Sequence, residues 1–552
     1  MKITLRTANN FEKVIERETP CSTEELVREL KGEFPYQILL CRKDGRPESL
    51  RTVLDHDCTV DLLDLRNPTG NMAYQVSLTF LYIKAVHDVL GPNTRVIISN
   101  SLSKGLFTQI RTGGIDDNTA GKIASRMNAL IRADAPFTGK RVNRSELEEF
   151  LNRFGRKDQT DLLNSSSDLK EAYLYTLDGE TEVFYHMLVP SAGYLKWFEV
   201  RRYKNGMLLR FPHPSSPDMI LPFEDQKQLY EAFSDAYHWD KIMRVEYAAD
   251  LNKMINKNEY SDLVLLSEAL HEKKIAEIAE EIKRLGKRIV LVAGPSSSGK
   301  TSFAKRLCIQ LRVSGMRPLY MGTDDYFLER WQTPLLENGE KDFESIRAMD
   351  INLFTQQMND LLAGKKVDLP EFDFKTGSKT FGIRFESLEP GQPVVLEGIH
   401  SLNPALTNGI ADDLKYRIYI SPLTQLNIDE HNRVPTTDGR LLRRMVRDYQ
   451  FRGYDAKHTI HAWPSVRAGE EQNVFPYDIN ADIFFNSHCL YELTALKKYA
   501  KPLLEEITPE DDEYMEAQRM LDFLACFSEM PDDSIIPNNS LVREFIGGSV
   551  LM

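Results

Sequence analysis

Short apolar runs alternate with amphipathic segments through the second half of the chain. These runs are rich in Val, Ile and Leu and lie at residues 289–293, 319–322, 394–396, 416–420 and 483–485. Continuous apolar runs of this length are typical of strands buried on both faces of a parallel sheet, and the segments between them have helical spacing. The pattern predicts a multidomain α/β protein in which residues 288–498 form a parallel sheet flanked by helices.

Residues 1–65 have the pattern of a small α+β unit. Residues 2–7 alternate as a strand, Ser22 and Glu25 make a capping box for a helix, and short apolar runs follow from residue 37 onward. A strand, a helix and several short strands in this order resemble the TGS domain, a ubiquitin-like module of threonyl-tRNA synthetases and some GTPases. The resemblance implies a β-grasp fold for this unit.

Residues 66–246 begin with a predicted helix at 72–90, followed by a strand at 95–99 and later aromatic strands. Because it follows a TGS-like unit, this α+β segment resembles the second additional domain of threonyl- and alanyl-tRNA synthetases. The editing site of that family uses a His-x-x-x-His pair, whereas the helix that carries His87 has no second histidine four residues away, and Asn100 follows the strand. We therefore expect a scaffold or binding module without editing chemistry or zinc.

Two helical segments flank the predicted parallel-sheet region. Residues 247–287 carry aliphatic and charged residues at helical spacing and end near Gly286, a C-cap signal, so they are predicted to be a helical connector. His271, among charged neighbours, is predicted to lie at the surface of this connector. Residues 499–552 are acidic with helical spacing and a break near Pro531, which predicts a C-terminal helical appendage.

The composition is that of a globular protein with several domains. The chain has 552 residues, of which 42% are hydrophobic and 27% charged, and its net charge is −13. An acidic chain is repelled by polyanions, which argues against broad binding to nucleic acid or to anionic membranes, although basic residues in the front units leave nucleic acid open there.

Location and assembly follow from the same composition. The six cysteines form no Cys-x-x-Cys pair, and neither a signal peptide nor a run of about 18 apolar residues is present. We therefore expect a cytoplasmic protein with reduced thiols and no membrane segment. The sequence leaves a homo-oligomer open.

A phosphate-binding loop follows the apolar run at 289–293. Glycines in the pattern G-x-x-x-x-G-K-[ST] let the backbone curl with its N–H groups inward, and the lysine and the following hydroxyl suit phosphates and Mg²⁺. Apolar residues then recur on one face of a helix, as expected after such a loop. The sequence predicts an ATP and Mg²⁺ site formed by Gly294, Pro295, Ser296, Ser297, Ser298, Gly299, Lys300, Thr301 and Ser302.

Acidic residues follow two of the predicted strands. Asp324 and Asp325 end the run at 319–322, and Glu397 follows the run at 394–396. Because ligands of parallel sheets bind at the carboxyl ends of the strands, one aspartate is a candidate proton acceptor and Glu397 a candidate magnesium residue. Helix capping is the alternative role for one of the two aspartates.

Arginines are concentrated in a predicted helix further along the chain, in the segment GRLLRRMVRDYQFRG. Phosphoryl transfer spreads negative charge over the transferring oxygens, and arginines on a mobile lid would stabilise it and exclude water. A solvated basic helix is the alternative, but a local excess of charge in an acidic chain favours an anionic ligand. The residues concerned are Arg443, Arg444, Arg447 and Arg452, and His458 and His461 beyond them are predicted to be polar lid residues.

Five motifs occur in the order found in one kinase family: GPSSSGKTS, TDDYF, LPEFDF, VVLEGIH and RRMVRDYQFRG. Over residues 288–498 they resemble the uridine kinase and phosphoribulokinase family, and with its front units the chain resembles the multidomain uridine kinase-related nucleoside kinases of bacteria. The resemblance implies that Asp324 is the general base for a sugar hydroxyl. It also implies that Lys300 and Thr301 are phosphate and magnesium ligands and that Glu397 is the second magnesium residue.

The resemblance also implies a nucleoside pocket. Phe372 and Asp373 fall on the Tyr-Asp-Phe motif that lines this pocket in the family, with phenylalanine in place of tyrosine. Uridine kinases carry a histidine that reads the pyrimidine five residues further on, where this chain has Gly377. The identity of the base therefore stays open. Substrate-binding and lid roles are implied for Arg444, Arg447 and Arg452.

The sequence thus predicts an ATP-dependent, Mg²⁺-requiring kinase that phosphorylates the 5′-hydroxyl of a nucleoside, with Asp324, Lys300 and Arg447 as catalytic residues. A first alternative is a kinase for another sugar, a hydroxy acid or a vitamin precursor. A second is a nucleotide-switched regulator whose front units bind RNA or another ligand. The presence of Asp324 favours turnover, because a switch needs no acceptor base.

Overall fold

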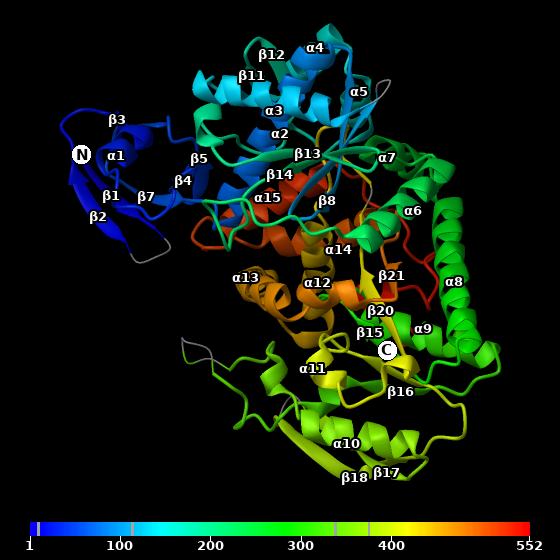
Figure 1. Cartoon of the computed structure of the whole chain (residues 1–552). Coiled ribbons are helices and arrows are strands. Elements are labelled where there is room, and N and C mark those ends of the chain that lie inside the picture. Colours follow the sequence, from blue (N-terminus) through cyan, green and yellow to red (C-terminus); the bar gives the residue numbers. More distant parts are fainter. Residues whose placement is uncertain (8–10, 112–114, 336–338, 340, 374–375, 425) are drawn as a thin grey trace.

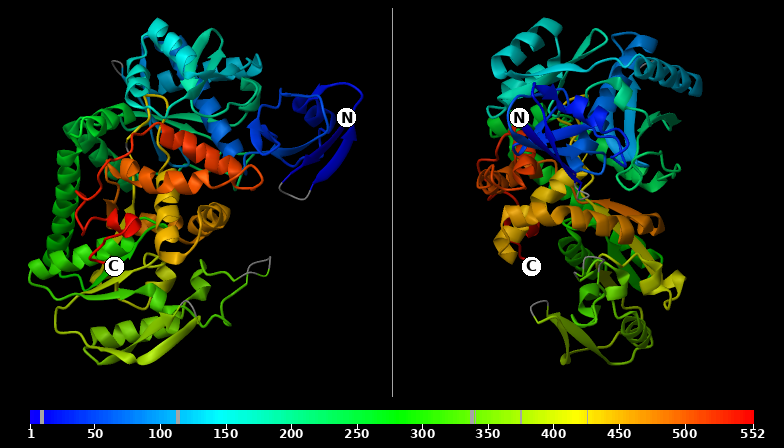
Figure 2. Two further views of the ribbon diagram at one scale, coloured as in Figure 1. Left: turned by 180° about the vertical axis from the view of Figure 1, so that it is seen from behind. Right: turned by 90° about the vertical axis from the view of Figure 1, so that its left-hand side faces the viewer.

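The computed structural model describes residues 1–7, 11–111, 115–335, 339, 341–373, 376–424 and 426–552 (Figure 1). A small N-terminal unit projects from one side, a larger α+β unit lies beside it, and a parallel sheet with its helices forms the other end of the molecule (Figures 1 and 2). None of the helices in these described ranges is both long and apolar enough to cross a lipid bilayer.

The N-terminal unit is a mixed sheet in the order β2-β1-β7-β4-β5, with one helix packed on it. Its capping box is confirmed: the Ser22 hydroxyl accepts a bond from the Glu25 amide, and the Glu25 carboxylate accepts one from the Ser22 amide. The β-grasp assignment remains a prediction. The elements are β1 (Lys2–Arg6), β2 (Glu12–Glu16), β3 (Cys21–Ser22), α1 (Thr23–Glu29), β4 (Leu40–Lys43), β5 (Arg46–Glu48), β6 (Val53–Leu54) and β7 (Cys58–Leu63).

The middle unit is built around helix α2 (Pro68–Leu90), which confirms the helix predicted at 72–90. Its central turns are buried, with Phe80, Tyr82 and Ile83 fully enclosed. Two sheets pack around it, in the orders β13-β14-β9-β8 and β10-β11-β12. The further elements are β8 (Arg95–Leu102), β9 (Gly105–Arg111), α3 (Asp117–Arg132), β10 (Thr138–Asn143), α4 (Arg144–Phe154), α5 (Lys157–Ser165), β11 (Glu171–Leu177), β12 (Glu180–Phe184), β13 (Glu199–Tyr203), β14 (Gly206–Arg210) and α6 (Lys227–Met243).

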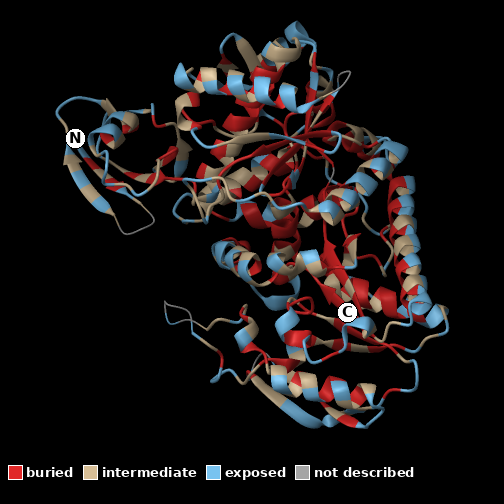
Figure 3. Ribbon diagram, in the orientation of Figure 1, coloured by how far each residue is buried: buried red, intermediate tan, exposed pale blue. Residues whose placement is uncertain are grey.

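The predicted parallel sheet is confirmed, in the order β16-β19-β15-β20-β21. Alternate residues of the central strand face opposite layers: Leu291 packs with α10, whereas Val290 and Val292 pack with α8 and α9. This two-sided burial explains the continuous apolar runs (Figure 3). The strands and helices are β15 (Ile289–Ala293), α9 (Lys300–Val313), β16 (Leu319–Gly322), α10 (Ile351–Leu362), β17 (Val367–Asp373), β18 (Ser378–Glu386), β19 (Val394–Glu397), α11 (Pro404–Thr407), β20 (Lys415–Ser421), α12 (Thr436–Arg452), α13 (Ala456–Asn473) and β21 (Ile483–Asn486).

The predicted connector contains α7 (Ala248–Asn256) and the long helix α8 (Tyr260–Arg284). The prediction that His271 lies at the surface is wrong. Its ring is buried against Phe485, 5.3 Å between centroids, and desolvation lowers its pKa to about 4. Of its charged neighbours in sequence, Lys273 is exposed, whereas Glu268 is buried beside His271 and pairs with Arg306 of α9.

The C-terminal residues belong to the largest core of the molecule. Helix α14 (Glu492–Glu505) runs across the predicted boundary at residue 498, and α15 (Tyr514–Ala525) and α16 (Arg543–Ile546) follow it. Their apolar side chains share one cluster with α7, α12 and the middle unit. The C-terminal segment is therefore packed into the body of the protein.

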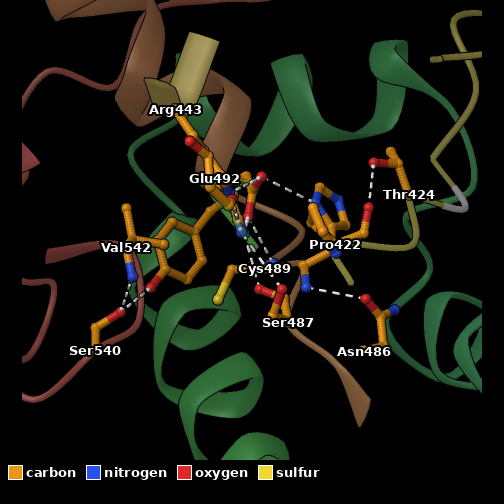
Figure 4. A network of polar contacts seen from close by, with 12 residues as sticks. Pro422, Thr424, Arg443, Asn486, Ser487, Cys489, Glu492, Ser540 and Val542 are labelled. Atoms are coloured by element: carbon orange, nitrogen blue, oxygen red, sulfur yellow. Dashed lines mark hydrogen bonds and ion pairs between the residues drawn. The ribbon is translucent and has the colours of Figure 1, made fainter. Parts of the chain in front are cut away.

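A buried ion pair fastens α12 to α14. Arg443 and Glu492 point toward each other at 0% and 1% side-chain exposure, with 2.5 Å between Nη2 and Oε2 (Figure 4). The Arg443 guanidinium also donates to the Ser487 carbonyl at 2.8 Å. Although desolvation opposes ionisation, Arg443 and His488 hold the pKa of Glu492 well below its usual range.

Removing one partner of this pair should loosen both helices. We predict that Glu492→Leu lowers the opening free energy of α12 and α14 by about 3–5 kcal/mol, because Arg443 is left as an uncompensated buried charge. Hydrogen–deuterium exchange of peptides from both helices measures the change. The double variant Arg443→Met with Glu492→Leu should recover part of the loss. Unchanged exchange in the single variant would contradict this account of the pair.

Candidate functional site

The loop between β15 and α9 is curled by three residues. A Cβ at Gly294 would overlap the carbonyl oxygen of Ile420 in the neighbouring strand, so this position requires glycine. Ser297 and Gly299 have φ values of 59° and 84°, in the left-handed region. Residues 294–299 thus form a tight loop, and the predicted site residues 300–302 form the start of α9.

Helix α12 holds the outer side of this loop. Arg440 Nε donates to the Ser296 carbonyl at 2.9 Å, and Arg443 Nη1 to the Ser297 carbonyl at 3.3 Å. Arg444 Nη1 donates to the Ser296 hydroxyl at 2.7 Å. Arg440 and Arg443 are buried, as is the apolar face of α12. The helix is therefore a fixed wall of the site, and the expectation of a mobile arginine lid is wrong for its buried face.

The two aspartates after β16 have different surroundings. Asp325 Oδ1 accepts a bond from the Phe372 amide at 3.3 Å and so fixes β17. Asp324 has no hydrogen-bond partner among the residues that the structure describes. Desolvation raises its pKa to about 6, against the opposing charge of Lys300. Because a backbone amide engages Asp325, Asp324 is the one of the two that remains the candidate proton acceptor.

The predicted metal residues lie side by side. Thr301 Oγ1 donates to Glu397 Oε1 at 3.0 Å, and the Tyr320 hydroxyl donates to the same oxygen at 3.3 Å. Desolvation raises the pKa of Glu397 to about 7, with Lys300 opposing the shift and Asp324 adding to it. A desolvated carboxylate beside a hydroxyl offers the hard oxygen ligands that Mg²⁺ prefers, so these residues fit that ion.

Lys300 links the acids to the loop. Its ammonium donates to the Gly294 and Pro295 carbonyls at 3.0 Å each. Desolvation lowers the pKa of Lys300, and the charges of Glu397 and Asp324 oppose that shift. The structure therefore brings the loop, the base candidate and the metal candidates together around Lys300.

The remaining predicted arginines surround one buried carboxylate that sequence patterns did not single out. Asp448 pairs with Arg447 at 2.7 Å, with Arg444 at 3.3 Å and with Arg452 at 3.5 Å. Three guanidinium groups around one carboxylate leave a net positive cluster. Arg452 also interacts electrostatically with Asp324, so the arginine cluster lies beside the candidate base.

The predicted nucleoside-pocket residues lie at the end of β17. The Phe372 ring is 5.8 Å from that of Phe327, and the Asp373 carbonyl accepts a bond from the Gly377 amide at 2.7 Å. Gly377 has a φ of 71°, and a Cβ there would lie 2.6 Å from the Arg330 side chain. The turn thus requires glycine at the position where the family resemblance predicts a histidine. The last residue of the LPEFDF motif lies outside the described residues.

Two further carboxylates accept hydrogen bonds from backbone amides of the predicted phosphate site. Glu470 Oε1, on α13, accepts from the Ser296 amide at 2.7 Å and also pairs with Arg440. Glu544 Oε2, on α16, accepts from the Ser302 amide at 3.2 Å and from its hydroxyl at 2.7 Å. Both contacts join segments distant in sequence, so no local pattern could reveal them.

Known proteins resemble the part of the chain that carries these site residues. The profile of the family described as "Phosphoribulokinase / Uridine kinase family" matches residues 289–490. A uridine kinase of Chloroflexus aurantiacus is 30% identical over 199 residues, which are 36% of this chain and 85% of that protein. A uridine kinase of Ligilactobacillus salivarius is 29% identical over 197 residues, 35% of this chain and 83% of that protein.

A solved structure aligns with the same share of the chain. It is titled "Structure of a Possible Uridine Kinase from Bacillus stearothermophilus" and is 19% identical, with a TM-score of 0.27, over 39% of this chain and 97% of its own.

The contact between Glu544 and Ser302 predicts a gain of affinity on substitution. A carboxylate on a loop amide repels a phosphate that needs the same donor, so Glu544→Gln should tighten binding of a non-hydrolysable ATP analogue by about tenfold, or 1.4 kcal/mol. Calorimetric titration with Mg²⁺ present measures the affinity. Glu529→Gln, an exposed position, is the control and should bind as the wild type does. Weaker binding by Glu544→Gln would show that the carboxylate supports the nucleotide site.

Proposed function

Because the chain belongs to the phosphoribulokinase and uridine kinase family through residues 289–490, we propose that it is an ATP-dependent kinase for the 5′-hydroxyl of a nucleoside. The observation that carries this proposal is the setting of Asp324. It is a carboxylate without a hydrogen-bond partner among the described residues, and it interacts electrostatically with both Lys300 and Glu397. An acceptor base in this position serves transfer to a hydroxyl and has no role in a nucleotide switch.

The loop and α9 bind the phosphates of ATP in this proposal. Amides of the loop and the Lys300 ammonium are the donors, and the N-terminus of α9 adds a favourable dipole. Thr301 and Glu397 would hold Mg²⁺, which neutralises phosphate charge when bound. Fixed donors around the phosphates supply the positioning on which most of such catalysis depends.

Asp324 accepts the proton of the attacking hydroxyl. With a pKa of about 6, its carboxylate is mostly ionised at neutral pH yet basic enough to take a proton as the oxygen attacks. The net positive cluster of Arg444, Arg447 and Arg452 around Asp448 faces the negative charge that spreads over the transferring oxygens. These residues account for the proton, the charge and the orientation of the acceptor.

The acceptor lies between β17 and the segment after β16. Phe372 and Phe327 offer aromatic faces for a planar base, and Asp325 fixes the backbone that presents them. Gly377 removes a side chain that could read the edge of the base. We therefore propose a pocket that selects for a sugar-linked aromatic ring more than for one pyrimidine.

A panel of acceptors tests this function. The purified full chain is incubated with ATP, Mg²⁺ and nucleosides, sugars or hydroxy acids, and mass spectrometry detects the gain of one phosphoryl group. At least one nucleoside should be phosphorylated at its 5′-hydroxyl. Phosphorylation of sugars or hydroxy acids alone would contradict the acceptor and keep the kinase, whereas no product with any acceptor would contradict both.

Substitution of Asp324, the proposed proton acceptor, tests the same function more specifically. Asp324→Asn should lower turnover by about 100-fold or more while ATP still binds, because an amide accepts no proton. Asp360→Asn, a half-exposed residue near the C-terminal end of α10 that pairs with Lys365, is the matched control and should keep full activity. Normal turnover by Asp324→Asn would refute the base assignment.

A further inference from the structure

The segment between β20 and α12 joins the kinase sheet to the middle unit. Its Glu430 carbonyl accepts from the Ile98 amide at 2.9 Å, and Asn427 Nδ2 donates to the Ile98 carbonyl at 2.7 Å. Asn432 Nδ2 donates to the Val183 carbonyl at 3.1 Å. These hydrogen bonds join the segment to β8 and β12 of the middle unit.

A cavity lies at this junction. Its volume is about 40 Å³, and its walls come from α2, β8, β9, the residues after β12 and the junction segment. A single water needs roughly 10–15 Å³ of such space, so the cavity has room for a small ligand. Met72, Val76, Ile98 and Leu106 form an apolar side, and Arg433 lies on the other.

Arg433 is a desolvated cation in this cavity. Among the described residues its guanidinium has neither a hydrogen-bond partner nor an ion-pair partner. The carboxylate that acts on it electrostatically, Asp438, is engaged by both Nη atoms of Arg519 at 2.7 and 2.9 Å. Desolvation lowers the pKa of Arg433 to about 10. An uncompensated cation in such surroundings is costly, which makes an anion a favourable addition.

Two other features of the cavity suit an anion. His186 lines it and has no hydrogen-bond partner in the described part of the chain, so its ring can donate one bond. Pro435, the residue before the first turn of α12, also lines the cavity. The positive end of that 17-residue helix therefore faces the same space.

We propose that this cavity binds a small organic acid, with its carboxylate on Arg433 and a short apolar chain against Met72, Val76 and Ile98. A guanidinium binds a carboxylate through two parallel bonds. One unpaired cation balances one negative charge, and the apolar wall disfavours a doubly charged, fully hydrated ion such as phosphate. The proposed site is separate from the nucleotide site, and binding of a ligand there does not depend on catalytic turnover.

The position of the cavity links it to the phosphate loop. Arg433 and Pro435 immediately precede α12, whose Arg440 and Arg443 hold the loop carbonyls. A ligand that orders the start of α12 would therefore act on the loop. This coupling, unlike the binding itself, rests on the proposed kinase function.

Thermal unfolding of the full chain with sodium butyrate as the probe tests the proposal. Butyrate should raise Tm by about 2 °C or more in a saturable way, relative to sodium chloride at equal ionic strength. Arg433→Met should abolish this shift and be at least as stable as the wild type without butyrate, because it removes an unpaired cation. Arg202→Met, an exposed arginine of β13, should keep the shift.

Three results would overturn the proposal. The first is the absence of a butyrate effect beyond that of chloride, and the second is an equal shift in Arg433→Met. The third is an Arg433-dependent shift with sodium phosphate but none with butyrate, which would assign the cavity to inorganic anions. None of these measurements uses ATP, so a protein that fails as a kinase can still pass this test.

Discussion

The outward carbonyls of the phosphate loop are the constraint on which the site depends. A loop that turns its amides inward must turn carbonyls outward, and those of Ser296 and Ser297 lie under α12. There they accept bonds from Arg440 and Arg443. A buried carbonyl without a donor would cost about 1–3 kcal/mol. The hydrogen bonds from these arginines offset that cost and allow the curled loop to be buried.

Buried arginines need carboxylates in turn, and this requirement shapes the rest of the domain. Glu470 of α13 pairs with Arg440, and Glu492 of α14 pairs with Arg443. The Arg443 guanidinium also lies 4.9 Å from the ring centroid of Phe545, in α16. The loop is thereby connected through α12 to the C-terminal segment on one side and, through the junction segment, to the middle unit on the other.

Local patterns predicted the elements of the site, and contacts between distant segments decided its details. The five strands and the loop were predictable because apolar runs and glycine spacing act within a few residues. Residue patterns alone left Asp324 and Asp325 open, and the family resemblance pointed to Asp324; the structural difference between them is an amide contributed by Phe372 of β17. The arginine-rich helix is predictable from its spacing, but which of its faces is buried is not, since the partner carboxylates lie on other helices. The burial of His271 likewise depends on a distant segment, because its ring packs on Phe485 of β21.

The central claim is that the curled loop and Lys300 together bind the phosphates of ATP. Calorimetric titration of the intact protein with Mg·ATP measures this most directly, comparing the wild type with Lys300→Ala and with Arg312→Ala at the exposed end of α9. The account predicts that the wild type and Arg312→Ala bind alike and that Lys300→Ala binds at least about tenfold more weakly. Equal affinity in all three proteins, or no binding by the wild type, would contradict it.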